Sequence, residues 1–410
     1  MVRSSKSSSS RHLAGHLLLL RAAALSLLAA RLPGNTASRS FFGAPINKVT
    51  IVGGTHGNEY TGIWCIKSIE KQRDLHNRGI QSSDARVINP FREYPSLTIN
   101  TLLSNPKAFM ANRRFIDTDL NREFSVQKLK RSVNPCPTGD GEQVPYEAAR
   151  AKEIESILGE KVDPDESACN GDEAETDAPS DIVIDLHTTT ANMGITIIIT
   201  EGDALMSAAA AYVLHKCKAE YGYDDVHCML EPPTERLDRT HLPSCGGHDI
   251  TIEVGPTPQG VVRHDVVERT TAALHSLLEF LHRGNAELEA PQSSDDATTI
   301  SERLREIYPY GVACYRFLGK IAWPSDPENP NFPAWMVHKS VQDRDFEPLR
   351  AGDPLFLASD GTVVPYDGSY GGEVLLVFVN EGGYYYASSG TGIGVAARGT
   401  FDLDTGRLRG

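Results

Sequence analysis

The sequence has few cysteines, and no two of them stand at metal-binding spacing. Seven cysteines are scattered over 410 residues without a single C-x-x-C pair. An odd, scattered set argues against a disulfide framework, and the missing pairs argue against a cysteine-rich zinc site. We therefore expect a protein of a reducing compartment, which counts against secretion.

Acidic residues are missing from the first 48 positions, which hold seven lysines and arginines among many serines. The apolar run at 17–30 is broken by Arg21 and is too short to cross a bilayer. This composition is typical of an organelle transit peptide, mitochondrial or plastid, or of a signal sequence; a disordered tail is the alternative. We predict that residues 1–47 form such a segment and that the mature body does not bind membranes.

The rest of the chain is strongly acidic. Without the first 48 residues the formal net charge falls from −14 to −21, because seven positive charges leave with them. So acidic a body is unsuited to binding nucleic acid through its phosphates. We therefore expect no nucleic-acid partner.

Strand-like and helix-like segments alternate between residues 48 and 286, which is typical of an α/β domain. Strands are expected at 47–52, 86–89, 181–187, 195–200 and 249–254, and helices at 60–70, 145–158, 202–221 and 262–282. Within this domain, residues 159–181 hold nine acidic residues and one lysine. That composition predicts a solvated, mobile insert.

A polar linker at 287–299 precedes a stretch rich in Gly, Pro, Tyr and Val. Short strands are expected there at 355–358 and 374–380, so residues 300–410 are predicted to form a small β-domain. The predicted fold is a mixed-sheet α/β core with a smaller β-rich C-terminal domain.

Two glycines end the first predicted strand, and His56 and Glu59 follow them three residues apart. This spacing can bring an imidazole nitrogen and a carboxylate to a common point about 2 Å from each. A catalytic zinc takes such mixed ligands, normally three from the protein with one position left open. An exposed pair at helix spacing would show the same pattern.

His187 ends a second apolar strand, so it falls at the carboxyl end of a strand, as His56 does. Ligands gather at these ends in α/β proteins. Asp185 lies two residues earlier and points to the same face, where it could orient the metal site. A histidine satisfied at a strand end is the alternative for His187 alone; together with the first pair, a metal site is favoured.

Hydrolysis at zinc also needs a general base and a cation that meets the developing oxyanion. Glu253 is a carboxylate in an otherwise apolar strand, which is costly unless it is paired or functional, so it is the candidate base. The loop at 112–122 holds three arginines and two aspartates. A guanidinium suits a substrate carboxylate, and a solvated charge cluster is the alternative.

Five segments together closely resemble the aspartoacylase family, which comprises aspartoacylase and the N-acyl-aromatic-amino-acid deacylases, zinc amidohydrolases of carboxypeptidase-like fold. In chain order they are 53–59 (GGTHGNE), 117–122 (DTDLNR), 185–189 (DLHTT), 252–260 (IEVGPTPQG) and 377–385 (VFVNEGGYY). The resemblance runs from about residue 48 to 386. It leaves out the N-terminal segment and the acidic insert.

The resemblance implies one zinc ion per subunit, with His56, Glu59 and His187 as its ligands. It implies that Glu253 is the base that activates the attacking water.

Four further residues match substrate contacts of the family. Arg114 matches the arginine that polarises the scissile carbonyl. Asn121 and Arg122 match the pair that grips the α-carboxylate. Tyr384 matches a tyrosine that the C-terminal domain brings over the site as part of a lid.

The chain departs from the family pattern in two places. Thr188 stands where the family usually has asparagine, which would change a substrate contact. The segment before Glu253 is about four residues longer, so the arginine that reads the substrate side chain has two candidates. Arg239 is favoured, and Arg236 is the alternative.

The activity implied by the resemblance is deacylation of small N-acyl-L-amino acids. N-acetyl-L-aspartate, cleaved to acetate and L-aspartate, is the favoured substrate, and N-acetyl aromatic amino acids are the alternative. A metal-binding homologue without catalysis is a further alternative, opposed by the presence of Glu253 and all three ligands. Acyl chain length and whether the protein forms a homo-oligomer are left open.

Overall fold

The computed structural model describes residues 40–81, 88–133, 144–161, 180–289, 298–329, 332–386 and 390–409, all within one compact unit, Ser40–Gly410. Most of the predicted N-terminal segment, residues 162–179 of the predicted acidic insert and residues 86–87 of the strand predicted at 86–89 lie outside these ranges. Among the described residues, no helix has both the length and the apolar character needed to cross a membrane.

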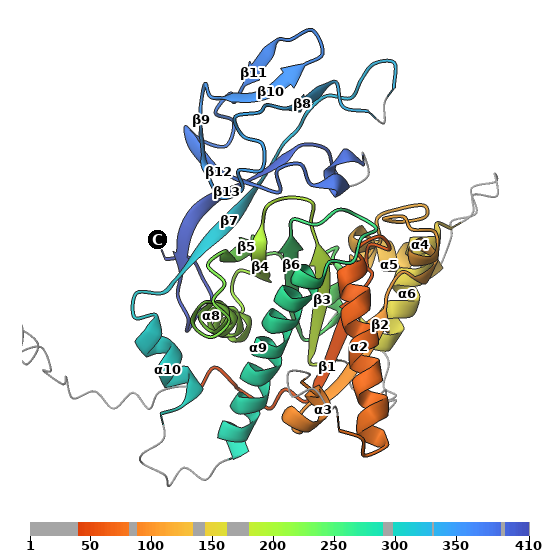
Figure 1. Ribbon diagram of the computed structural model, residues 1–410, viewed down its shortest axis with the longest axis vertical. Coiled ribbons are helices and arrows are strands. Elements are labelled where there is room, and N and C mark those ends of the chain that lie inside the picture. Colours follow the sequence, from red (N-terminus) through yellow and green to blue (C-terminus); the bar gives the residue numbers. More distant parts are fainter. Residues whose placement is uncertain are drawn as a thin grey trace, which may run out of the picture. The chain divides into compact units, whose positions relative to one another are not determined.

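Ten strands form one mixed sheet in the order β2-β1-β3-β6-β4-β5-β7-β13-β12-β9 (Figure 1). They are β1 Lys48–Gly53, β2 Thr98–Leu103, β3 Ile182–Thr188, β4 Gly194–Thr200, β5 Val226–Glu231, β6 His248–Gly255, β7 Val312–Ile321, β9 Pro348–Arg350, β12 Glu373–Val377 and β13 Ile393–Phe401. Strands β2, β1, β3 and β6 run parallel, whereas β4 joins β6 antiparallel. The predicted mixed sheet is confirmed.

Helices pack against both faces of the α/β part of the sheet (Figure 1). They are α2 Tyr60–Asn77, α3 Pro90–Glu93, α4 Pro106–Met110, α5 Val126–Val133, α6 Tyr146–Leu158, α8 Ala204–Ala219, α9 His264–Glu289 and α10 Ile300–Ile307. Successive side chains along a strand point to opposite faces of the sheet. Ile51 and Ile184 pack in the core with α2, α8 and α9, while Val52 and Val183 pack with α5 and α6.

The helices predicted from the sequence are present, and two of them run further than expected. Helix α2 continues beyond 70 to Asn77, and α9 continues beyond 282 to Glu289, into the first residues of the predicted linker. Strands β2 and β5 were not predicted. Strand β2 is an edge strand whose sequence, TINTLL, carries polar residues at three of its six positions and so lacks the apolar run of a central strand.

The C-terminal region is rich in β-strands, as predicted, and its strands extend the main sheet. Strand β7 pairs in parallel with β5 at Met229↔Tyr315 and Leu230↔Arg316. A separate three-stranded sheet contains β8 Trp335–Val337, β10 Pro354–Ala358 and β11 Val363–Pro365. Three short 3-10 helices, η1 Leu120–Arg122, η2 Leu242–Cys245 and η3 Gly382–Tyr385, lie in the connecting loops.

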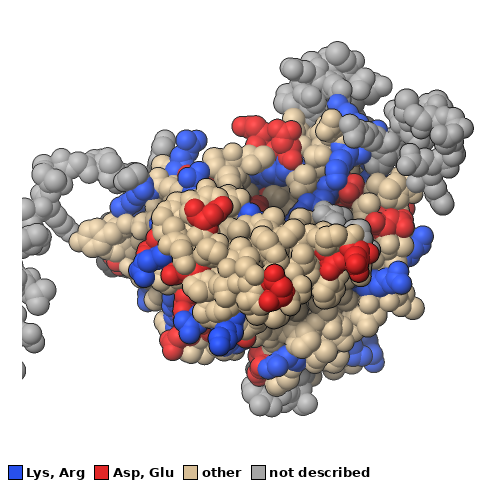
Figure 2. Space-filling model, turned by 90° about the horizontal axis from the view of Figure 1, so that it is seen from above, with Lys and Arg blue, Asp and Glu red and all other residues tan. Residues whose placement is uncertain are grey.

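Charge on the molecular surface is mixed. Figure 2 shows basic and acidic side chains interspersed on the face seen from above. The formal net charge of −14 therefore does not make that face uniformly negative.

Candidate active site

The chain turns sharply between β1 and α2, and this turn presents His56 and Glu59 at the carboxyl end of the sheet. Gly54 has a φ of 77°, which favours glycine. A Cβ on Gly53 would lie 2.6 Å from the backbone of Gly62, so only glycine allows this close approach. Glu59 is the N-cap of α2, and its side chain is buried with that of His56.

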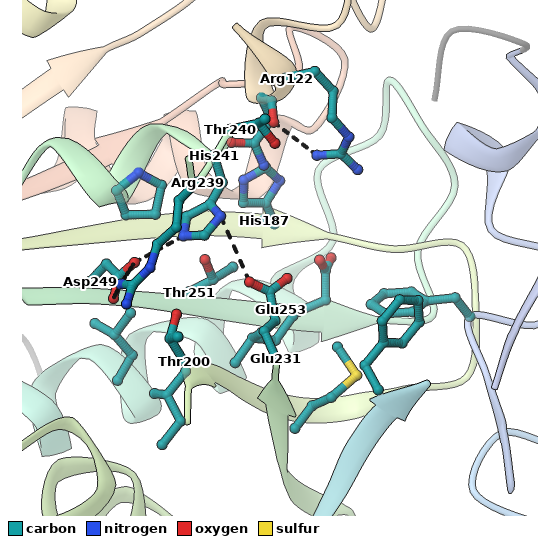
Figure 3. Close-up of a pocket in the computed structure, with 18 of the residues that line it drawn as sticks. Arg122, His187, Thr200, Glu231, Arg239, Thr240, His241, Asp249, Thr251 and Glu253 are labelled. Atoms are coloured by element: carbon teal, nitrogen blue, oxygen red, sulfur yellow. Dashed lines mark hydrogen bonds and ion pairs between the residues drawn. The ribbon is translucent and has the colours of Figure 1, made fainter. Parts of the chain in front are cut away.

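Strands β3 and β6 bring His187 and Glu253 side by side. The two residues are partners in the parallel register, and both lie near the carboxyl ends of their strands (Figure 3). Neighbouring parallel strands thus collect residues that are far apart in sequence, as the pattern of strand ends predicted.

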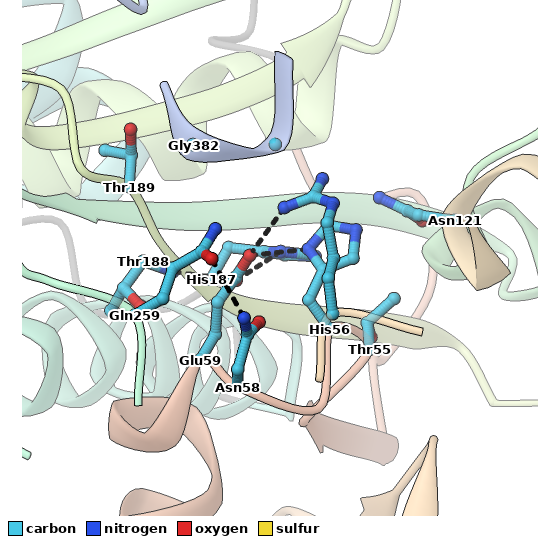
Figure 4. A network of polar contacts seen from close by, with 12 residues as sticks. Thr55, His56, Asn58, Glu59, Asn121, His187, Thr188, Thr189, Gln259 and Gly382 are labelled. Atoms are coloured by element: carbon cyan, nitrogen blue, oxygen red, sulfur yellow. Dashed lines mark hydrogen bonds and ion pairs between the residues drawn. The ribbon is translucent and has the colours of Figure 1, made fainter. Parts of the chain in front are cut away.

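Glu59 lies between the two histidines (Figure 4). Its Oε1 is 2.6 Å from His56 Nδ1, and its Oε2 is 2.9 Å from His187 Nδ1. One ligand atom from each residue lies within 4.8 Å of the others. Two imidazole nitrogens and one carboxylate form a donor set that zinc uses, with room for a further ligand. These three residues therefore fit a metal ion.

A carboxylate orients each histidine from behind. His56 Nε2 is 3.1 Å from Asp119 Oδ1, and His187 Nε2 is 2.9 Å from Asp185 Oδ2. The Thr55 hydroxyl donates in turn to Asp185 Oδ1 at 2.9 Å. Such partners fix the orientation of a ring and leave its other nitrogen for a metal. Asp185 lies where the sequence placed it, whereas Asp119 was seen only as part of a charged loop.

Neighbouring charges shift the pKa values of three groups of this centre: His187, Glu59 and Asp119. Against the effect of burial, the carboxylates of Asp185 and Glu59 raise the pKa of His187 well above its ordinary value. Against the same effect, the two histidines lower the pKa of Glu59. Burial also opposes ionisation of Asp119, but His56 holds its pKa well below the ordinary value.

Arg114 is buried among three carboxylates. Its Nη1 lies 3.2 Å from Glu59 Oε1 and 3.8 Å from Glu381 Oε1, and its Nη2 lies 3.5 Å from Asp119 Oδ2. Burial would lower the pKa of Arg114, but these neighbours raise it, so the guanidinium stays charged. A fixed cation beside the metal site is well placed for a developing oxyanion.

Glu147, in the first turn of α6, holds the loop that carries Arg114. Its buried carboxylate accepts hydrogen bonds from the backbone N–H groups of Ile116 (2.7 Å), Asp117 (2.9 Å) and Thr118 (3.1 Å). A carboxylate accepts at both oxygens, and no neutral side chain of this size can do the same.

We expect Glu147→Gln to lower the free energy of unfolding by about 3 kcal/mol, because bonds to a buried charged acceptor are lost and an amide nitrogen faces N–H donors. Urea denaturation measures the loss. Glu153→Gln is the control on the same helix, where an exposed Glu153 pairs with Arg150 at 2.8 Å and contributes about 1 kcal/mol or less. Equal losses in the two variants would contradict this role of Glu147.

The centre opens into a cavity of about 340 Å³. The ten site residues named from the sequence all line it: His56, Glu59, Arg114, Asn121, Arg122, His187, Thr188, Arg239, Glu253 and Tyr384. Glu253 is half-buried in the wall. Burial raises the pKa of Glu253 well above its ordinary value, although His187 opposes the shift.

Backbone and side-chain bonds fix the predicted substrate-binding residues. Asn121 Oδ1 accepts from the Leu242 N–H at 2.9 Å, and Arg122 Nη1 donates to the Asn121 carbonyl at 2.8 Å. Thr188 contacts the centre through its backbone, whose N–H donates to Glu59 Oε2 at 3.1 Å. Because this bond is made by the backbone, it does not depend on the threonine side chain.

The C-terminal region supplies part of the cavity wall. Glu381 accepts from the Thr190 N–H at 3.0 Å, and the buried Tyr384 follows it in η3. Lys320 Nζ lies 3.4 Å from the ring centroid of Tyr384. Burial, with the charge of Arg122, lowers the pKa of Lys320 to about 8. Lys320 stands in a β-strand without a motif, so no sequence signal pointed to it. Glu381 lies in the 377–385 segment, but no sequence pattern indicated a role for it.

A second charged group lines the cavity away from the metal centre (Figure 3). Arg239 Nη1 donates to the two carboxylate oxygens of Asp249 at 3.1 and 3.0 Å, and its Nε donates to the Thr234 carbonyl at 2.8 Å. His241 Nε2 lies 2.9 Å from Asp249 Oδ2. Burial opposes ionisation of Asp249, but His241 and Arg239 lower its pKa to about 2. We call Arg239, His241 and Asp249 the side-chain subsite.

Arg236, the alternative to Arg239, has a different environment. It donates to the backbone carbonyls of Ser244, Cys245 and Gly246. It is not among the residues that line the cavity. Of the two candidate arginines, Arg239 is therefore the one that lines the cavity.

The architecture is that of a mixed-sheet α/β protein with a candidate metal centre at its strand ends and a β-rich C-terminal region. Residues 45–281 match the succinylglutamate desuccinylase/aspartoacylase catalytic domain, and residues 311–391 match the AstE/AspA barrel-sandwich hybrid domain. The chain belongs to the succinylglutamate desuccinylase/aspartoacylase family.

Individual relatives cover most of the chain. It is 31% identical to aspartoacylase of Rattus norvegicus over 342 residues, 83% of this chain and 90% of that protein. It is 33% identical to N-acyl-aromatic-L-amino acid amidohydrolase (carboxylate-forming) A of Danio rerio over 350 residues, 84% and 88% of the two chains. The crystal structure of murine aminoacylase 3 matches with a TM-score of 0.64 and 27% identity, over 89% of this chain and 99% of that one. The predicted family and fold are confirmed.

Proposed function

We propose that this protein is a zinc-dependent amidohydrolase that deacylates N-acyl-L-amino acids, with N-acetyl-L-aspartate as its favoured substrate. One observation carries the proposal: Glu253 lies beside His187 in register, in the wall of a cavity that also contains the His56 and Glu59 side chains. A candidate base, a fitting ligand set and a space for a small substrate thus occur together. The names of the relatives support the same substrate class.

In the proposed reaction, different residues of the chain have different roles. A zinc ion held by His56, Glu59 and His187 would polarise the acyl carbonyl and lower the pKa of the attacking water. Glu253 takes the proton from that water and returns it to the leaving amine. Arg114 stabilises the negative charge that develops on the carbonyl oxygen.

Two groups of side chains hold the amino-acid part of the substrate. Asn121 and Arg122 bind the α-carboxylate of any N-acyl amino acid, so they do not choose among side chains. Choosing aspartate requires a second cation to offset desolvation of the second carboxylate. Arg239 has that position in the cavity wall, and Asp249 fixes its orientation.

We expect Arg239→Ala to weaken transition-state binding of N-acetyl-aspartate by about 2–5 kcal/mol, the usual loss when a buried charge is left unpaired. Activity on N-acetyl-tyrosine, which has no side-chain carboxylate, should change little or rise. The measurement is kcat/KM for both substrates with zinc-loaded enzyme.

Arg236→Ala is the matched control, since Arg236 contacts carbonyls outside the cavity lining. It should change both substrates equally. An equal loss of both activities in Arg239→Ala would make Arg239 structural as well.

Deacylation of N-acetyl aromatic amino acids is the second candidate function. The cavity lining includes Phe317, Phe378 and Met229 as well as Tyr384, which could pack against an aromatic side chain. Assay of the zinc-loaded wild type on a panel of N-acetyl amino acids distinguishes the two functions. A preference for aromatic substrates from the outset would overturn the aspartate proposal.

A further inference from the structure

Lys161 is a buried lysine in a part of the chain that composition predicts to be solvated. It is the single lysine of residues 159–181, yet only 4% of its surface is exposed. Its Nζ donates to the Phe124 carbonyl at 2.8 Å, the Arg239 carbonyl at 2.8 Å and the Ser244 hydroxyl at 2.6 Å. An ammonium is costly to bury, and here all three donors have partners.

The Lys161 ammonium joins the loop at 232–247 to the segment that follows η1. The same two segments are joined by backbone bonds from Phe124 N–H to the Thr240 carbonyl (3.1 Å) and from Val126 N–H to the Leu237 carbonyl (2.9 Å). This loop carries Arg239 and His241 of the side-chain subsite. Arg239 is therefore held twice, through its carbonyl by Lys161 and through its guanidinium by Asp249.

Lys161 is itself anchored to α6. Its backbone N–H donates to the buried Oε1 of Glu155 at 3.0 Å. Glu147, near the other end of the same helix, holds the loop that carries Arg114. Helix α6 is thus connected to the loop that carries Arg114 through Glu147, and to the loop that carries Arg239 through Lys161. These contacts are separate, so loss of the Lys161 contacts leaves those of Glu147 in place.

We propose that Lys161 is a positioning residue that sets side-chain selectivity by fixing the Arg239 backbone in the cavity wall. This inference rests on the proposed function, because selectivity is read from N-acyl amino acids. Arg114, Asn121 and the metal ligands make no contact with the Lys161 ammonium among its three bonds. Removal of the ammonium should therefore change the ratio of kcat/KM values between two substrates more than it changes the rate of cleavage of a substrate that lacks a charged side chain.

Lys161→Met, which keeps the apolar stem and removes the ammonium, tests the proposal. We expect kcat/KM for N-acetyl-aspartate to fall about tenfold, as small misplacements of a binding group allow, while N-acetyl-alanine is cleaved nearly as before. Lys161→Gln keeps one donor group and should give an intermediate ratio. Lys128→Met is the control: this ammonium on neighbouring α5 pairs with Glu123 at 3.1 Å, its side chain is 41% exposed, and the ratio should not change.

A double-mutant cycle separates positioning from general support. In the Arg239→Ala background, Lys161→Met should change the substrate ratio no further, because the residue through which Lys161 acts is gone. Equal losses on both substrates, or a full additional effect in that background, would overturn the proposal.

Hydrogen exchange gives a readout that does not need activity. Amides of residues 234–244 should exchange faster in Lys161→Met than in the wild type, with residues 114–122 unchanged. If the wild type cleaves none of the N-acetyl amino acids but the loop exchanges faster, the proposed function fails and the support of the loop stands. Unchanged exchange would overturn the role of Lys161 itself.

Discussion

Glu253→Gln is expected to keep its zinc and its affinity for substrate while turnover falls by about 10²–10⁴-fold. Glutamine matches the shape of glutamate and can still form hydrogen bonds, but it cannot accept the proton of the attacking water. Glu253 lies in register with His187, a candidate metal ligand. This position is the reason to expect a large loss of turnover from replacing one carboxylate oxygen by an amide nitrogen. The measurements are kcat at saturating substrate and zinc content by metal analysis.

Glu231→Gln is the matched control for this result. Glu231 also lines the cavity, but it lies on β5, its side chain is 41% exposed, and its Oε2 lies 3.7 Å from His241 Nδ1. It should retain most of the turnover. Near-normal turnover in Glu253→Gln would mean that another carboxylate of the cavity is the base. Glu381, which also lines the cavity, would then be the next candidate.

His56→Ala and His187→Ala should each lose most of the bound zinc, because three protein ligands are the usual minimum for a catalytic zinc. Each substitution also leaves the Glu59 carboxylate with one histidine in place of two. Metal analysis after dialysis measures the loss, and turnover should fall with it.

His241→Ala provides the comparison, since His241 lines the same cavity but bonds Asp249 and lies outside the candidate metal centre. It should keep its zinc. Full zinc content in both His56→Ala and His187→Ala would show that the metal, if bound, is held elsewhere.

The candidate metal ligands and the candidate base could be predicted from the sequence because each belongs to a short local pattern at the end of a strand. Strands β1, β3 and β6 are parallel neighbours in the sheet, so the turn with His56 and the strand ends with His187 and Glu253 meet at one edge. The order of these strands is a tertiary feature that the sequence analysis did not predict.

Asp119, Glu147 and Lys161 could not be placed in the same way. Each is a charged residue in a polar stretch, where sequence composition indicates solvent exposure. Each is nonetheless buried, because partners distant in sequence satisfy its charge: His56 for Asp119, backbone N–H groups for Glu147, and the 239–244 segment for Lys161. Burial of a charge depends on tertiary contacts, which composition does not record.

Only part of the structure of the C-terminal region could likewise be predicted from the sequence. Its β-rich character follows from composition, but the pairing of β5 with β7 depends on two strands far apart in the chain. Lys320 and Tyr384 reach the cavity only through that pairing and the strands that follow it.

The junction of β5 and β7 also bears on how the cavity beside the candidate metal centre is built. Backbone hydrogen bonds run without interruption from β2 to β9, so the C-terminal strands share one continuous sheet with those that carry His187 and Glu253. Tyr384 and Glu381 consequently line the same cavity as Glu253, in a region whose strands continue the sheet that carries Glu253. We therefore expect a substrate to enter a space that is already shaped for it, without a separate domain having to close over the site first.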